Sequence, residues 1–392
     1  MNDWAVIIVI YATLFISIPL IAILHELGHA FAYLLLTKPD KIDIYIGSYI
    51  KPESAIVFNA GKLNFYIKGS FPFVKGIGLC KSDKAETNYL KYIIILLAGP
   101  VFTFFVASTI GVIVLNLDVH PLIKISCYII LGISTLSLIS NLVPKNIAPL
   151  YKVNLNNDGK QILFVLKIRG ALRDFIEAKE HLIKNELELA ILKFEKVLEM
   201  DTYNEKVLRL IVAASLTAKK YDITTFYIDK LESKYELTAG DLLQKGCLQS
   251  FINKHDEAIE TYRKVLKKDS QNVIALNNMG YELTEKGAYD VAQQALYKAI
   301  KLKPEFDHPY STLGYSKILQ GEMETGKKLI DKCLQLNTEN SYAYKALGIY
   351  YLKQKEAKLA NENFDKAKML NSDIDFGLFA DELKQLTEQD IA

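Results

Sequence analysis

The chain lacks the features that mark several large classes of protein. Its four cysteines are scattered and form no CxxC pair, which excludes a disulfide scaffold. The net charge is only +2 over 392 residues, so there is no basic excess of the kind that nucleic-acid binding requires. Hydrophobic residues make up 50% of the chain, which excludes a wholly disordered protein.

Charged residues are scarce in the first 170 positions. This part holds 15 Lys and Arg and 9 Asp and Glu, whereas the remainder holds 32 and 36. Glu26 is the only charged residue between Trp4 and Thr37, and residues 92–117 and 125–144 contain none. A membrane-spanning helix needs roughly 20 apolar residues. Buried core helices are the alternative, but three such runs favour spanning helices, at about 5–36, 92–117 and 122–144.

Lysines set the expected orientation of these helices. The loop between the first and second helices carries nine lysines, and further basic residues follow the third helix. Basic loops lie on the cytoplasmic side, which places the N-terminus outside and everything after Pro144 inside. We therefore expect an integral protein of a bacterial cell membrane, in contact with the lipid bilayer.

The first cytoplasmic loop, about 41–75, has the pattern of a strand followed by a hairpin. Ile42, Ile44 and Ile46 alternate with other residues, and apolar residues at 55–58 and 63–67 flank a turn. The edge of such a sheet can accept an extended peptide as an additional strand. A sheet that only packs on the helices is the alternative.

The single charge in the first apolar run belongs to an HExxH motif, His25-Glu26-Leu27-Gly28-His29. On a helix, residues four apart lie on one face, so both imidazoles can bind one Zn²⁺ ion. Glu26 would act as the general base on zinc-bound water. Zinc needs a third protein ligand, and the spacing leaves both Asp158 and Asp40 as candidates, with Asp43 close to Asp40.

These motifs resemble the site-2 protease family of intramembrane zinc metalloproteases. The family's HExGH motif is matched by 25–29, its Ala-Gly-Pro element by 98–100, its Asn-x-x-Pro element by 141–144 and its Asp-Gly element by 158–159. The resemblance implies that His25, His29 and Asp158 bind zinc. It also implies that Glu26 is the base and that Asn141 binds the substrate carbonyl or oxyanion.

The chain departs from the family pattern between the last two elements. The stretch from Asn141 to Asp158 is longer than in many members, its segment 145–157 is polar, and Lys160 stands where a second glycine is usual. This departure bears more on the implied substrate-binding role of Asn141 than on the implied zinc ligands. The apolar run 161–166 predicts a short helix that begins at Asp158 and could place this ligand rigidly.

The second half of the chain is repetitive, with a period of about 34 residues, the length of a tetratricopeptide unit. Gly246, Gly280, Gly314 and Gly348 show this spacing, and small residues repeat it at two further positions in each unit. About six units cover 171–374, and the remaining residues predict a capping helix. The pattern resembles the tetratricopeptide repeat, in which paired antiparallel helices stack into an array that binds peptides or proteins.

The sequence therefore predicts an all-α membrane protein with a small juxtamembrane sheet, followed by an α-solenoid. Residues 1–170 would form the intramembrane metalloprotease core and 171–392 a cytoplasmic repeat domain. The expected function is that of a zinc endopeptidase that cleaves membrane proteins or peptides in or beside the bilayer, with the repeats recruiting a substrate or regulator. The alternative is an inactive, membrane-anchored tetratricopeptide scaffold.

Overall fold

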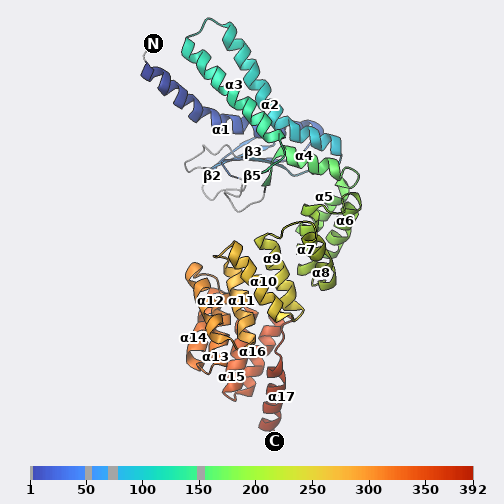
Figure 1. Ribbon diagram of the computed structural model, residues 1–392, viewed down its shortest axis with the longest axis vertical. Coiled ribbons are helices and arrows are strands. Elements are labelled where there is room, and N and C mark those ends of the chain that lie inside the picture. The colour runs from blue at the N-terminus through green and yellow to red at the C-terminus, as the bar shows by residue number, and fades with distance from the viewer. Residues whose placement is uncertain (1–2, 49–54, 69–77, 148–154, 392) are drawn as a thin grey trace. The chain divides into compact units, whose positions relative to one another are not determined.

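A computed structural model of the chain describes residues 3–48, 55–68, 78–147 and 155–391 (Figure 1). The chain divides into two compact units, Met1–Thr202 and Tyr203–Ala392. The first unit contains long apolar helices and the β-structure, and the second contains paired shorter helices. This matches the expected fold class of a mostly helical chain with a small sheet and a helical-repeat region.

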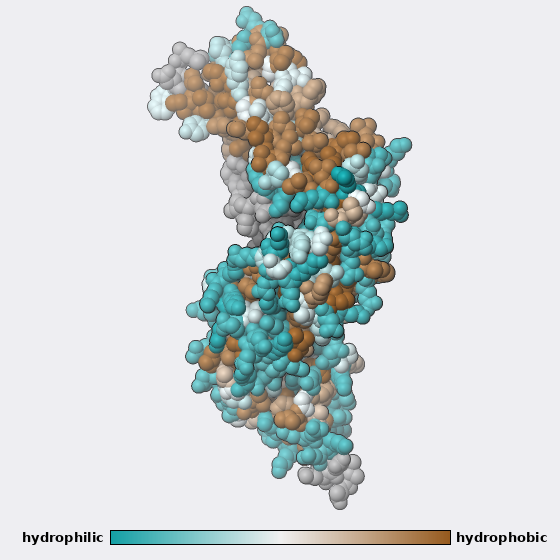
Figure 2. All heavy atoms as spheres, turned by 45° about the vertical axis from the view of Figure 1, so that its right-hand side comes forward, coloured by the Kyte–Doolittle hydropathy of each residue, from teal (hydrophilic) through white to brown (hydrophobic). Residues whose placement is uncertain are grey.

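Three helices in the first unit are long and apolar enough to cross a membrane. They are α1 (Asp3–Leu36), α2 (Tyr89–Asn116) and α3 (Pro121–Leu142). α1 contacts both α2 and α3. In Figure 2, hydrophobic residues dominate the surface around these helices, and hydrophilic residues dominate that of the repeats. Many large apolar side chains are exposed there, as lipid-facing residues would be.

A four-stranded sheet lies between α1 and α2 in the chain. Its strands are β1 (Ile42–Ile46), β2 (Ala55–Ala60), β3 (Leu63–Lys68) and β4 (Gly78–Ser82), in the order β2-β3-β1-β4. The alternating isoleucines of β1 are buried beside Ala30 of α1 and Phe65 of β3. The sheet thus contains the predicted strand and hairpin, together with a fourth strand, β4, that the sequence pattern does not predict. Residues 49–54 and 69–77 lie outside the described residues.

A short helix connects the three long apolar helices to the first repeat pair. After the two-residue strands β5 (Asn146–Ile147) and β6 (Leu155–Asn156), α4 (Asp158–Lys167) begins at the predicted zinc ligand. The ring of Phe164 contacts Phe175 of α5 (Leu172–Ile183), which packs on Phe194 of α6 (Leu187–Met200). The expected boundary after residue 170 therefore falls inside the first compact unit, because α5 and α6 share a core with α4.

The second unit consists of helix pairs with a terminal helix. Its helices are α7 (Glu205–Thr217), α8 (Tyr221–Glu232), α9 (Ala239–Phe251), α10 (His255–Lys268), α11 (Val273–Glu285), α12 (Tyr289–Leu302), α13 (His308–Leu319), α14 (Met323–Leu336), α15 (Ser341–Lys353), α16 (Ala357–Leu370) and α17 (Leu378–Ile391). Together with α5 and α6, the described helices make the six pairs expected within 171–374.

The regular spacing of the repeat glycines has a packing cause. A Cβ atom on Gly246 would lie 2.5 Å from the ring of Tyr262 in the partner helix. The other three repeat glycines each face one large side chain in the same way: Gly280 faces Leu296, Gly314 faces Ile330 and Gly348 faces Phe364. Each glycine therefore lets the two helices of a pair approach closely around one large side chain.

Candidate metal centre

The three predicted zinc ligands converge in the first unit. The Nε2 atoms of His25 and His29, one turn apart on α1, lie 3.1 Å from each other. Asp158, the first residue of α4, places its Oδ2 atom 3.2 Å from Nε2 of His25 and 3.7 Å from Nε2 of His29. The structure thus brings a carboxylate to the two histidines from beyond the third long apolar helix, much later in the chain.

The chemistry of these three side chains fits a tetrahedral zinc ion. Zinc lies about 2.0–2.2 Å from nitrogen and oxygen ligands, which holds ligand atoms about 3.3–3.6 Å apart in a tetrahedron. The observed triangle of 3.1, 3.2 and 3.7 Å is close to this size. Oδ2 of Asp158 is buried and faces the Nε2 atoms of both histidines. A buried cation would neutralise it, and three ligands leave the fourth position open.

The surroundings of His29 orient its ring for such a role. Its Nδ1 atom is 2.7 Å from the carbonyl oxygen of Ile95, which can only accept, so Nδ1 donates and Nε2 keeps its lone pair. A Cβ atom on Gly99 would lie 2.4 Å from Nε2 of His29, and one on Gly28 would lie 2.5 Å from the carbonyl oxygen of Ala98. The glycines of the HExGH and Ala-Gly-Pro elements therefore let α2 pack directly against the histidine.

Asp158 is held in place by the residues on either side of it. A Cβ atom on Gly159 would lie only 2.0 Å from the carbonyl oxygen of Leu142, so the close contact of α4 with the end of α3 requires glycine. Asn157 is the N-cap of α4 and is 3% exposed. Asn157 is not among the residues that the sequence predicts for the site, although an asparagine before Asp-Gly is a helix N-cap signal.

Glu26 is buried beside the ligand cluster and next to strand β4. Its side chain is 5% exposed, and its carboxylate accepts a backbone hydrogen bond from Cys80. A Cβ atom on Gly78 would lie 2.6 Å from Oε1 of Glu26, so a larger residue at position 78 would displace this carboxylate. Burial raises the pKa of the Cys80 thiol. Cys80 is not part of the cluster formed by His25, His29 and Asp158.

The other candidate residues have different surroundings. Asp40 is 3.1 Å from the ammonium group of Lys84, and Asp43 accepts a hydrogen bond from Asn64 on β3. Neither belongs to the cluster formed by His25, His29 and Asp158. The amide nitrogen of Asn141 donates to the carbonyl and hydroxyl oxygens of Ser137, one turn earlier in α3. The role of Asn141 in binding substrate stays a prediction.

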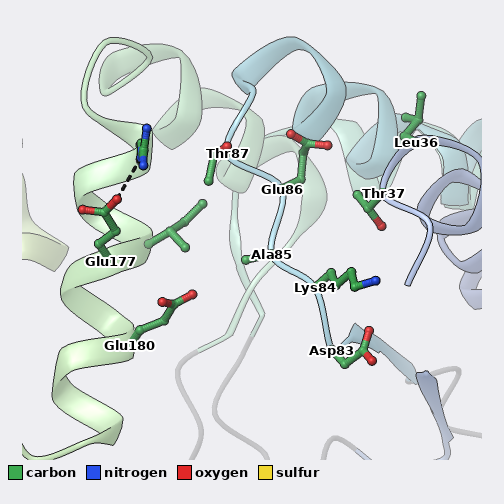
Figure 3. Close-up of a pocket in the computed structure, with 11 residues that line it drawn as sticks. Leu36, Thr37, Asp83, Lys84, Ala85, Glu86, Thr87, Glu177 and Glu180 are labelled. Atoms are coloured by element: carbon green, nitrogen blue, oxygen red, sulfur yellow. Dashed lines mark hydrogen bonds and ion pairs between the residues drawn. The ribbon is translucent and has the colours of Figure 1, made fainter. Parts of the chain in front are cut away.

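A separate hollow of about 750 Å³ lies in the first unit between α5 and the segment that leads from β4 to α2 (Figure 3). The side chains that line it include Lys84, Glu86, Arg173, Glu177 and Glu180, and none of the three cluster residues. Hydrogen bonds from Lys193 and Arg173 lower the pKa of Glu177. Much of the charge in this hollow is therefore paired within the chain.

The family that this chain matches among known proteins is matched in its repeat region. The sequence matches the tetratricopeptide repeat family at residues 242–272 and 273–306. No curated protein matches the chain. Similar solved structures include YrrB, described as a TPR protein with an unusual peptide-binding site, at 16% identity over 48% of this chain and 95% of that one, with a TM-score of 0.39.

Two further structures resemble the chain at low identity. PilW, a type IV pilus biogenesis factor, is 17% identical over 56% of this chain and 99% of that one, with a TM-score of 0.44. MamA from Desulfovibrio magneticus is 22% identical over 44% of this chain and 97% of that one, with a TM-score of 0.35. From the family match, the chain carries tetratricopeptide repeats in its C-terminal region, a fold that serves protein–protein interaction.

Proposed function

We propose that the chain is a membrane-embedded zinc endopeptidase whose repeats recruit a protein substrate or regulator. The observation that carries the proposal is the convergence of His25, His29 and Asp158 on one point, with the buried Glu26 beside them. Two imidazoles and two carboxylates in an apolar helix bundle are costly unless they serve a function. The lysine-rich loops favour a cytoplasmic site in a bacterial membrane, with the N-terminus outside.

The proposed residues have distinct roles in the hydrolysis of a peptide bond. Bound at His25, His29 and Asp158, Zn²⁺ would supply Lewis-acid chemistry that polarises the scissile carbonyl and acidifies the attacking water. Glu26 would accept a proton from that water as the water oxygen attacks the carbonyl carbon. It would then donate the proton to the amine as the C–N bond breaks. The buried site around Glu26 would exclude bulk water from these transfers.

A helical substrate must unwind before it can be cleaved, because its amides are engaged in internal hydrogen bonds. We propose that the outer edge of β4, the last strand of the sheet among the described residues, receives the unwound segment. At the end of the β1–β4 ladder, the backbone N–H of Asp83 donates to the carbonyl oxygen of Lys41. In an antiparallel pair, every second residue bonds to the neighbouring strand, and those between point their N–H groups the other way. The register therefore points the amides of Gly78, Cys80 and Ser82 away from β1. The amide of Cys80 already reaches Glu26, so a strand added at this edge would pass the base.

Replacing Ser82 with proline tests this edge. Proline removes an amide that points away from β1, so the pairing of β4 with β1 should persist while one bond to the added strand is lost. We expect a several-fold lower cleavage rate with unchanged zinc content. Ser82→Ala, which removes only the hydroxyl group, is the matched control. Equal rates for Ser82→Pro and Ser82→Ala would exclude this edge as the docking site.

The comparisons support a second candidate function better than they support the protease. In this alternative the chain is a membrane-anchored tetratricopeptide scaffold without catalytic activity, and it is favoured by the family match at residues 242–306. The two candidate functions share the repeats and the spanning helices. They differ in whether the cluster on α1 and α4 binds a metal.

Metal analysis of the purified full-length protein separates the two functions. We expect about one zinc per chain, lost in His25→Ala and weakened in Asp158→Ala, because each variant removes one of three ligands. Asp40→Ala is the matched control, since Asp40 is exposed and pairs with Lys84. Wild-type protein that binds no metal would favour the scaffold. Normal zinc in Asp158→Ala would require a different third ligand.

A further inference from the structure

The buried side chain of Asn157 bridges the end of α3 and the start of α4, next to the pairing of β5 with β6 that closes the link between these helices. Its Oδ1 atom accepts from the backbone N–H groups of Lys145 and Lys160, both at 3.0 Å. Its Nδ2 group donates to the carbonyl oxygens of Ser140, at 3.0 Å, and Val143, at 2.6 Å. One amide thus satisfies four backbone groups from the end of α3, the start of the link and the first turn of α4.

This arrangement bears on the unusual length of the link. The long stretch between Asn141 and Asp158 would by itself leave the third ligand free to adopt many positions relative to α3. Asn157 is adjacent to Asp158 and is tied to α3 at two carbonyl oxygens, so the length of the intervening chain no longer affects where Asp158 lies. Gly159 on the other side allows the two helices to touch.

We propose that Asn157 is a positioning residue, which fixes the Asp158 carboxylate against His25 and His29 and thereby sets the affinity of the site for zinc. The inference rests on the proposed zinc site. Asn157 itself does not bind the metal, and it acts only through Asp158. Groups that orient a metal ligand typically change metal affinity by about 10- to 100-fold when they are replaced.

Two variants separate the accepting and donating halves of this side chain. Asn157→Asp keeps both acceptor contacts but places a carboxylate oxygen against two carbonyl oxygens. Asn157→Ser keeps a capping hydroxyl and removes the contacts to Ser140 and Val143. Asn88→Asp is the matched control, because Asn88 is the N-cap of α2, and its acceptor contacts with Leu90 and Lys91 survive the change.

Zinc affinity, measured by competition with a chelator, should fall at least about 10-fold in both Asn157 variants and remain unchanged in Asn88→Asp. A double-mutant cycle then tests whether Asn157 acts through Asp158. In an Asp158→Ala background, Asn157→Ser should change the residual affinity less than about twofold. An equal loss of affinity in both backgrounds would mean a general structural role and would overturn the proposal, as would wild-type affinity in Asn157→Asp.

Hydrogen exchange of the metal-free, full-length protein tests the same contacts without zinc. We expect faster exchange at residues 140–145 and 158–162 in Asn157→Ser than in wild type. Unchanged exchange would overturn the positioning role. If wild-type protein binds no zinc but Asn157→Ser still speeds exchange, the proposed protease function fails while the role of Asn157 in placing Asp158 stands.

Discussion

Replacing Glu26 with glutamine is expected to lower the cleavage rate by about 10²- to 10⁴-fold while leaving the zinc content unchanged. Glutamine has the same size and shape as glutamate, so it fits against Gly78 and can still accept the hydrogen bond from Cys80. Its amide cannot accept the proton of the attacking water. The two outcomes therefore separate the chemistry of Glu26 from its packing.

The measurement compares new protein termini in membranes that contain wild type or Glu26→Gln, since this works with a substrate that has not been identified. Purified proteins then supply the zinc content. Glu86→Gln is a matched control, because Glu86 is also a buried glutamate of the first unit and accepts a hydrogen bond from the backbone of Asn88, which glutamine preserves. Cleavage that persists in Glu26→Gln would remove Glu26 as the base and favour the scaffold.

The elements that the sequence predicts well are those with a strong local signal. The three apolar runs correspond to α1, α2 and α3, and the alternating isoleucines form the buried face of β1. The regular period of the repeats predicts the helix pairs because a glycine at each period is needed to pack one large partner side chain. Such local patterns can be recognised in the sequence without knowledge of the tertiary fold.

The elements that the sequence does not predict depend on contacts between distant segments. Strand β4 includes Gly78 and Lys81 and has no clear alternation, so its strand state comes from pairing with β1. The sequence leaves Asp40 and Asp158 open as third ligands, because only the packing of α4 against α2 and α3 brings Asp158 to the histidines. The capping tendency of Asn157 is local, but its bonds to Ser140 and Val143 are not.

The first repeat pair is a further case in which packing overrides sequence pattern. α5 and α6 carry the repeat signature, yet Phe175 packs on Phe164 of α4 and places the pair in the first compact unit. α4 therefore has Asp158 at one end and the core of the first repeat pair at the other. In the proposed protease, this helix would connect the first repeat pair directly to the metal site.

Replacing Gly159 with alanine is expected to have the second large effect, on both stability and zinc binding. The new Cβ atom would lie 2.0 Å from the carbonyl oxygen of Leu142. Because the clash is with backbone at the end of α3, no side-chain rotation relieves it, and α4 must move away. Overpacking of this kind typically costs about 1–3 kcal/mol. The same movement would carry Asp158 away from His25 and His29, and zinc would be lost.

Gly132→Ala is the control that isolates this contact. Gly132 lies in α3, and a Cβ atom there would meet nothing within 4 Å. Alanine at this helical position should leave zinc binding unchanged, because it adds no clash and removes only backbone freedom. Thermal unfolding in detergent and zinc content of the two variants provide the comparison. If Gly159→Ala keeps its zinc and its stability, Asp158 is not held by the contact between α3 and α4, and the proposed geometry of the metal site is wrong.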